Sequence, residues 1–286
     1  MKKLTAFIFA VIVSCVCVFA QSSVWEISKN GNTIYLGGSV HLLRSEDFPL
    51  PKEFDTTFDK SEILVLEANV GQMDSPEVIQ KLMGQAMLPG DATLQTVLNT
   101  ETYKLLESKC AELNIPIAAL LKMKPGMAAT TLSTMKLLQI GFTPQGVDTY
   151  YFAQASKKGK QSEFLETIDF QINLIVNIGE GYENEFVVYT LSDLDNIEKE
   201  MNALVPEWRN GASSYVDTEF SKMKKEFPSV YKIMLSDRNQ AWLPIIETYL
   251  KNKKAAFVIV GLAHLHGKDG LLALLQKKGY TVKQVK

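Results

Sequence analysis

Short apolar runs rich in β-branched residues lie near both ends of the chain, and they predict the strands of a sheet. Residues 24–27 and 33–36 flank Asn30-Gly31, and Asn-Gly between two such runs is the strongest short-range signal for a β-hairpin. Residues 63–66 and 255–260 are apolar throughout, as expected of strands buried on both faces. The sheet is therefore expected to contain segments from both ends of the chain.

Between these runs the apolar positions recur every three to four residues, which is typical of helices that bury one face. The pattern extends over residues 94–113, 127–138, 173–189 and 230–250. Proline lacks a backbone donor and disfavours helix in the residue before it, so we expect helix boundaries just before the prolines of this region. These prolines are Pro116, Pro125, Pro144, Pro206, Pro228 and Pro244.

Residues 280–285 predict a last strand, so the strands cluster at the two ends of the chain with helices between them. This arrangement predicts an α/β or α+β fold with a central mixed sheet, in which segments distant in the sequence pair with one another. We expect one domain over residues 21–286, with a mostly helical centre over about residues 76–250.

The first twenty residues have the pattern of a bacterial signal peptide. Lys2 and Lys3 precede an almost unbroken apolar run over residues 4–19, and cleavage is expected after Ala20. A lipoprotein leader that ends at Ser14, with a lipid on Cys15, is an alternative. A retained membrane anchor is a third, but the run is shorter than the roughly 20 residues that a bilayer requires. The leader predicts a periplasmic or extracellular protein, with no membrane span after processing.

The composition is that of an ordinary globular protein: of 286 residues, 46% are hydrophobic and 22% are charged. It excludes a disordered, collagen-like or polytopic membrane protein. The formal net charge is −2 and there is no basic block, so nucleic-acid binding is not expected. Cys110 is the one cysteine after the leader, so no internal disulfide is possible, and its helical setting favours packing over a nucleophilic role.

The histidines carry the most informative pattern in the sequence. His41 closes Gly38-Ser39-Val40-His41 directly after one predicted strand, and His264 closes Gly261-Leu262-Ala263-His264 directly after another. Glycine at a strand end permits close backbone approach, so a histidine three residues later can lie over the carboxyl edge of the sheet, where open α/β sheets place ligands. A single histidine at a strand end could equally be a core residue, but the repetition favours a functional site.

Glu67 directly follows the apolar run 63–66, where a carboxylate needs a cation or a donor to offset its desolvation. Together with His41 and His264 it makes a set of two histidines and one carboxylate, which suits Zn, Mn, Co or Fe. We therefore hypothesise a divalent-metal site that activates water for hydrolysis of a carbonyl group. A strand-terminal glutamate that is simply solvated remains the alternative for Glu67 taken alone.

Taken together, these motifs resemble the TraB/PrgY/GumN family, which is similar to the TIKI metalloproteases and more distantly to ChaN and erythromycin esterase. The likeness covers about residues 24–285, and the paired Gly-x-x-His is its most specific part. The other segments that carry it are Trp25-Glu26-Ile27, Leu64-Val65-Leu66-Glu67, Gly146-Val147-Asp148, Leu165-Glu166-Thr167 with Gln171, Asp237-Arg238-Asn239 and the tail 267–279.

The resemblance implies a central sheet whose paired histidines face one cleft, with helical insertions around it. In TIKI-like members this cleft is associated with peptide cleavage that depends on a divalent metal, with manganese or cobalt favoured. The roles that it implies here are metal ligands His41, His264 and Glu67; catalytic residues Glu67, Glu166, Arg238 and Asn239; and substrate-binding residues Arg238, Asp148 and His266.

Several of these residues also have purely structural interpretations. Asp148 could stabilise the first turn of a helix through the helix dipole. Glu166-Thr167 could be the end of a strand and the cap of the helix that contains Gln171. Arg238 could be a buried ion-pair partner of Asp148 or Glu166. Asp237 departs from the longer acid that is usual in the family, which leaves its role open.

Three functions remain in competition at this stage. The leading one is an exported metal-dependent hydrolase that acts on a peptide or protein substrate. The second is a binding module that uses the same histidines to hold haem or a peptide without turnover. The third is an esterase that uses a histidine base without metal. The sequence contains no His-Glu-x-x-His, Gly-x-Ser-x-Gly or phosphate loop, so the corresponding enzyme classes lose support.

Overall fold

The computed structural model of the protein describes residues 22–192 and 194–286. The predicted leader, with its alternative cleavage and lipidation sites, lies outside the described residues. Within them, no helix is both long enough and apolar enough to cross a membrane.

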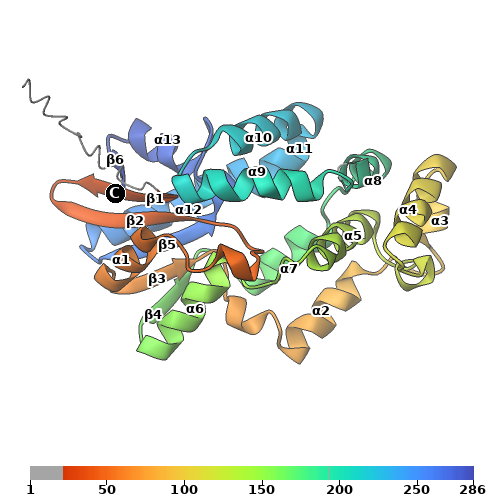
Figure 1. The fold of residues 1–286 in the computed structure, drawn as a ribbon, viewed down its shortest axis with the longest axis horizontal. Helices are drawn as coiled ribbons and strands as arrows, with labels where there is room; N and C mark the ends of the chain where they lie inside the picture. Colours follow the sequence, from red (N-terminus) through yellow and green to blue (C-terminus); the bar gives the residue numbers. More distant parts are fainter. Residues whose placement is uncertain (1–21, 193) are drawn as a thin grey trace, which may run out of the picture.

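A six-stranded mixed sheet forms one end of the molecule, in the order β4-β3-β5-β2-β1-β6 (Figure 1). Its strands are β1 (Val24–Lys29), β2 (Asn32–Ser39), β3 (Ile63–Leu66), β4 (Gln161–Phe164), β5 (Ala256–Gly261) and β6 (Thr281–Gln284). The four strands β4, β3, β5 and β2 run parallel to one another. Strand β1 pairs antiparallel with both β2 and β6. The predicted α/β fold with a central mixed sheet is confirmed.

Helices cover both faces of the sheet and extend away from it to the opposite end of the molecule (Figure 1). They are α1 (Lys52–Lys60), α2 (Pro76–Ala86), α3 (Leu94–Val97), α4 (Thr100–Glu112), α5 (Pro125–Gln139), α6 (Val147–Lys158), α7 (Ile168–Val176), α8 (Glu183–Ser192), α9 (Ile197–Asn210), α10 (Ser214–Glu226), α11 (Pro228–Tyr231), α12 (Asp237–Lys251) and α13 (Leu271–Lys277). Short turns of other helical types are η1 (Ser45–Asp47), η2 (Val70–Gln72), η3 (Ile117–Ala119), the π-helical η4 (Lys232–Ser236) and η5 (Leu262–His264).

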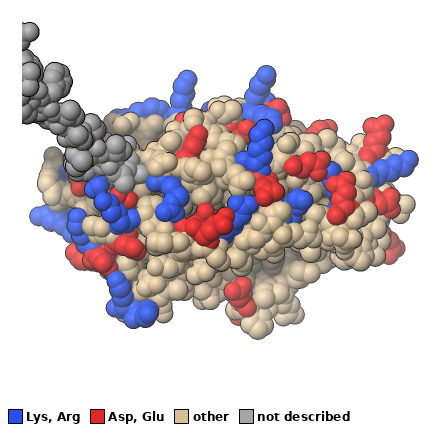
Figure 2. Space-filling model, in the orientation of Figure 1, with Lys and Arg blue, Asp and Glu red and all other residues tan. Residues whose placement is uncertain are grey.

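Alternating side chains of the sheet build two cores, because successive residues of a strand point to opposite faces. Val258 and Val260 of β5 pack with α12 and α13, where Trp242 and Leu275 are buried. Phe257 and Ile259 face the other way and pack with α1, α6 and α9, around residues such as Trp208. A further cluster, built from α4, α5 and α8, stabilises the helical end. Charged residues of both signs are interspersed over the face shown in Figure 2.

Two sequence expectations about the helices are wrong in part. Pro125 and Pro228 begin helices, but Pro206 lies inside α9 and Pro244 inside α12. Burial of each large apolar side chain contributes about 1.5–3 kcal/mol, so several of them in one helix outweigh the cost of an interior proline, about 3 kcal/mol. The pattern over residues 173–189 spans two helices, α7 and α8, because the turn between them takes left-handed backbone at its glycines.

Candidate functional site

The ends of three neighbouring parallel strands bring the predicted residues to one edge of the sheet. Ser39 at the end of β2 pairs with Gly261 at the end of β5, and Leu66 at the end of β3 pairs with Ile259. His41 follows β2 by two residues, Glu67 follows β3 directly, and His264 closes the turn η5 after β5. Parallel strands end at the same edge, so segments almost the whole chain apart meet there.

Gly261 lies at the centre of this group. A Cβ atom on Gly261 would lie 3.2 Å from His41 Nε2, 3.3 Å from Glu67 Oε1 and 3.6 Å from the Cδ2 atom of His264. The backbone N–H of Gly261 donates to Glu67 Oε1 at 2.6 Å. The missing side chain therefore leaves a small space that both imidazoles and the carboxylate border.

His41 is held by a carboxylate on its far side. Its Nδ1 lies 3.1 Å from Asp148 Oδ1, and the same oxygen accepts a hydrogen bond from the Ser39 hydroxyl at 2.7 Å. Asp148 is in the first turn of α6, as its structural interpretation expected, whereas its predicted substrate-binding role stays a prediction. Because Asp148 can only accept while ionised, His41 Nδ1 carries a proton and Nε2 is directed to the space at Gly261.

His264 is held by an amide in a corresponding way. Asn239 Nδ2 donates to the carbonyls of His264, at 3.2 Å, and Asp269, at 2.8 Å, which leaves Asn239 Oδ1 as an acceptor. That oxygen lies 2.7 Å from His264 Nδ1, so Nδ1 is the protonated nitrogen. The lone pair of His264 is therefore on Nε2, which faces Glu67 and Arg238.

Arg238 uses all five of its N–H donors inside the protein. Nε and Nη2 bind the two oxygens of Glu166, each at 2.9 Å, and Nη2 also binds Glu67 Oε2 at 2.5 Å. Nη1 donates to the Met234 carbonyl at 3.1 Å and to His264 Nε2 at 3.0 Å. The side chain is 5% exposed. The interpretation of Arg238 as a buried ion-pair partner therefore fits the geometry, with Glu166 and not Asp148 as its partner.

A second layer that the site prediction did not include supports Arg238. Trp242 Nε1 donates to Glu166 at 2.9 Å, and the Trp242 ring packs 4.4 Å from the His264 ring and 4.6 Å from the guanidinium. Gln171 Nε2 donates to Glu166 at 2.7 Å. Trp242 lies four residues after Arg238 on α12 and so shares its helix face, which is a signal that the sequence does contain.

The electrostatics of the site follow from these contacts. Asp148 raises the pKa of His41 to about 9. Burial alone would raise the pKa of Glu67, but the positive charges of Arg238 and His41, together with the Gly261 N–H, hold it below its ordinary value. Burial lowers the pKa of His264 to about 3, so that imidazole is neutral at physiological pH.

Among the described residues, no three His, Cys, Asp or Glu side chains are arranged so that they could share a metal ion. Arg238 is the physical reason, because its guanidinium contacts both His264 Nε2 and Glu67 Oε2. The donor set nevertheless suits a divalent cation. Both imidazoles are oriented through Nδ1, as metal-ligating histidines are by their outer partners.

A cavity of about 570 Å³ opens over this edge of the sheet. Its floor contains His41, Glu67, Arg238 and His264, together with Gly261. Its walls come from α8, α9, α10 and η4 and include Phe186, Met201, Leu204, Phe220, Met223 and Met234. The site is thus a polar floor beneath a largely apolar chamber.

The structure does not bring His266 to this group. His266 lines a separate cavity beside Asp217 and Lys224, and its ring packs edge-on against Trp25 at 5.3 Å. The other residues predicted for the site all lie around the cavity floor or bind a residue that does. Thr167 caps α7 by accepting from the Phe170 N–H at 3.1 Å, as its structural interpretation expected.

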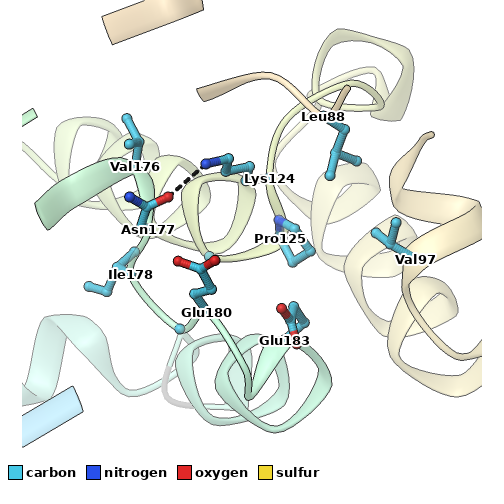
Figure 3. A pocket seen from close by; sticks show the side chains of 11 residues that line it. Leu88, Val97, Lys124, Pro125, Val176, Asn177, Ile178, Glu180 and Glu183 are labelled. Carbon is cyan, nitrogen blue, oxygen red and sulfur yellow. Dashed lines mark hydrogen bonds between the residues drawn. The ribbon is translucent and has the colours of Figure 1, made fainter. Parts of the chain in front are cut away.

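Another hollow, of about 400 Å³, lies between α5, α7 and α8 (Figure 3). Lys124 donates to Asn177 there at 2.6 Å, and the carboxylates of Glu180 and Glu183 lie near it. It contains no residue that the sequence predicted for a site. Ile178 lines both this hollow and the chamber above His41, so the turn after α7 separates the two.

Comparison with known proteins gives one family and two relatives. The family model described as TraB/PrgY/gumN family matches residues 23–284. The chain is 21% identical over 265 residues to the uncharacterized protein YbaP of Escherichia coli strain K12, which covers 88% of this chain and 91% of that protein. The YbaP protein of Shigella flexneri is similar to the same extent. No solved structure gives a significant match.

Proposed function

The chain belongs to the TraB/PrgY/gumN family, and we propose that it is an exported hydrolase that cleaves peptide-type carbonyl bonds at the strand edge around Gly261. The observation that carries this proposal is the convergence of His41 Nε2, Glu67 Oε1 and the His264 ring within 3.6 Å of one open point. The apolar leader supports export. Polar groups bordering a space of this kind, beneath a chamber, are the usual form of a small-molecule or peptide site.

Our first candidate mechanism includes a divalent ion. His41 Nε2, Glu67 and His264 Nε2 would hold it, while Asp148 and Asn239 keep both rings in the required tautomer. When bound, such an ion supplies Lewis acidity, which lowers the pKa of water and polarises a carbonyl. Arg238 must release His264 Nε2 for this arrangement to form, and Glu166 provides the carboxylate that would retain the guanidinium.

A second candidate is favoured by the contacts of Arg238 and by the His41–Asp148 pair. Here the guanidinium is the cation that Glu67 and His264 share, and His41 Nε2 takes the proton from water as a general base when the imidazole is neutral. Because Asp148 raises the pKa of His41 to about 9, the rate by this route should rise with pH up to about 9. Glu67, anchored by Arg238 and the Gly261 N–H, would orient that water. This route requires no metal.

Metal analysis of the purified mature protein, combined with digestion of a peptide library with and without chelator, tests the proposal. The metal route predicts about one divalent ion per chain, lost when both His41 and His264 become alanine, and cleavage that chelator abolishes and manganese restores. Chelator-resistant cleavage would favour the second candidate. The control is His266→Ala, since His266 lies outside the chamber.

Failure of the wild-type protein to cleave any library member, under every metal condition, would overturn the hydrolase proposal. The absorption spectrum of the same sample tests the alternative of a binding module. A Soret band would indicate haem.

The variant Gly261→Ala tests whether the space beside Gly261 is needed for activity. The backbone angles of Gly261, φ −49° and ψ 136°, suit alanine, so we expect the fold to be retained. The new methyl group would lie 3.2 Å from His41 Nε2 and 3.3 Å from Glu67 Oε1, closer than ordinary van der Waals contact, so it would displace both side chains. We expect kcat/KM to fall about 10²-fold, as for a displaced reacting group. Gly84→Ala, on α2 with open space around it, is the matched control and should be silent.

A further inference from the structure

The chamber above the site has a polar floor and mostly apolar walls. Its floor bears the imidazoles and Glu67, whereas Leu204, Phe220 and Met223 on α9 and α10 form part of the wall, which Glu200 of α9 also lines. Its volume of about 570 Å³ lies within the range of about 300–1,000 Å³ that small-molecule sites occupy. A bound molecule would place its polar group on the floor and a sizeable apolar group against α9 and α10.

The charges around the chamber disfavour an anionic ligand. The carboxylates of Glu67 and Glu200 line it, and so does one guanidinium, that of Arg238. All five donors of Arg238 are already bound to protein atoms, so none is left to pair with a carboxylate of a ligand. His41 also lines the floor, but Asp148 Oδ1 already pairs with its Nδ1 at 3.1 Å, so a free carboxylate of a ligand would add a further negative charge beside Glu67.

Three methionines contribute to the apolar wall. Met201, Met223 and Met234 come from three separate segments, α9, α10 and η4, and each lines the chamber. Unbranched thioether side chains are flexible and fill irregular gaps. The wall can therefore adapt to a flexible apolar chain.

We propose that the substrate is an amide or ester whose acyl portion is a long, neutral, unbranched apolar chain, which fills the chamber while its carbonyl lies at Gly261. The chain belongs either to a fatty acyl group or to the side chain of the residue that precedes a scissile peptide bond. The inference rests on the proposed hydrolase function and specifies its substrate class.

A series of straight-chain acyl p-nitroanilides, from acetyl to decanoyl, tests it in the full-length mature protein. Each buried methylene is expected to raise kcat/KM about fourfold until the chamber is full. A peptide pair with norleucine or alanine before the scissile bond distinguishes the two sources of the chain. Binding of primary amides of the same lengths, followed by calorimetry, measures the chamber independently of turnover.

The outcomes separate the two proposals. Turnover that does not depend on chain length overturns the acyl-chain inference but leaves the proposed hydrolase function standing. Affinity that rises with chain length, in the absence of any turnover, supports binding of the chain in the chamber and overturns the proposed hydrolase function. Absence of both turnover and binding overturns both.

One substitution tests whether the chamber wall causes the preference for long chains. Met223→Glu places a charge in the wall and should abolish the preference for long chains while acetyl anilide is still cleaved. Met83→Glu, on the exposed face of α2, is the matched control and should leave the preference unchanged. An unaltered chain-length preference in Met223→Glu would contradict the assignment of this chamber.

Discussion

Replacing Arg238 by methionine is expected to lower the free energy of unfolding by about 3–5 kcal/mol, because it leaves two carboxylates without their cation in a buried site. Glu67 and Glu166 both bind the guanidinium, and their side chains are 15% and 7% exposed. Methionine fills similar space but donates no hydrogen bond. Urea unfolding followed by circular dichroism measures the change.

Two further variants make this prediction specific. Lys158→Met removes the cation of an exposed pair with Asp59 and should leave the urea midpoint almost unchanged. Adding Glu166→Gln to Arg238→Met removes one of the stranded charges, so the double variant should lose less stability than the two single changes summed. A normal midpoint for Arg238→Met would show that the ion-pair network does not hold the site together.

Substitution of His41 by alanine is expected to reduce kcat/KM by about 10²–10⁴-fold, the usual contribution of a positioned acid–base group. Both candidate mechanisms use His41 Nε2, so the loss does not depend on which one operates. The His41 side chain is 53% exposed, so the fold should survive the change. The readout is hydrolysis of a peptide or an acyl anilide, with the urea midpoint measured on the same sample.

Asp148→Asn is the graded companion to this variant. Asparagine can keep a hydrogen bond to His41 Nδ1 but removes the negative charge, so the rate should fall less than in His41→Ala. Full activity of His41→Ala would refute a role for His41 in the chemistry, whatever the behaviour of Asp148→Asn.

The sequence patterns were sufficient to predict five of the six strands, all but β4, and the meeting of strand ends at one edge of the sheet. Asn30-Gly31 specified the hairpin, and the fully apolar run 63–66 specified a strand buried on both faces. The repeated Gly-x-x-His placed His41 and His264 on one edge because parallel strands end together. These predictions required only local turn and burial patterns and the rule that parallel strands end at the same edge of a sheet.

Other features depend on three-dimensional packing and leave no local signal. Pro206 and Pro244 read as helix boundaries until the burial of their helices is known. The complete use of the Arg238 donors requires β3, β4, η4 and η5 to be in place at once. The chamber wall likewise comes from helices whose mutual packing no periodicity specifies.

The central position of β5 has a consequence for biosynthesis. This strand lies between β2 and β3, yet it is translated long after both. A nascent chain already contains His41 while His264 is still unmade, so the sheet and the site at Gly261 cannot close before β5 has left the ribosome. Pairing over such sequence separations folds slowly. We expect the sheet to stay open and the site to be inactive until that point.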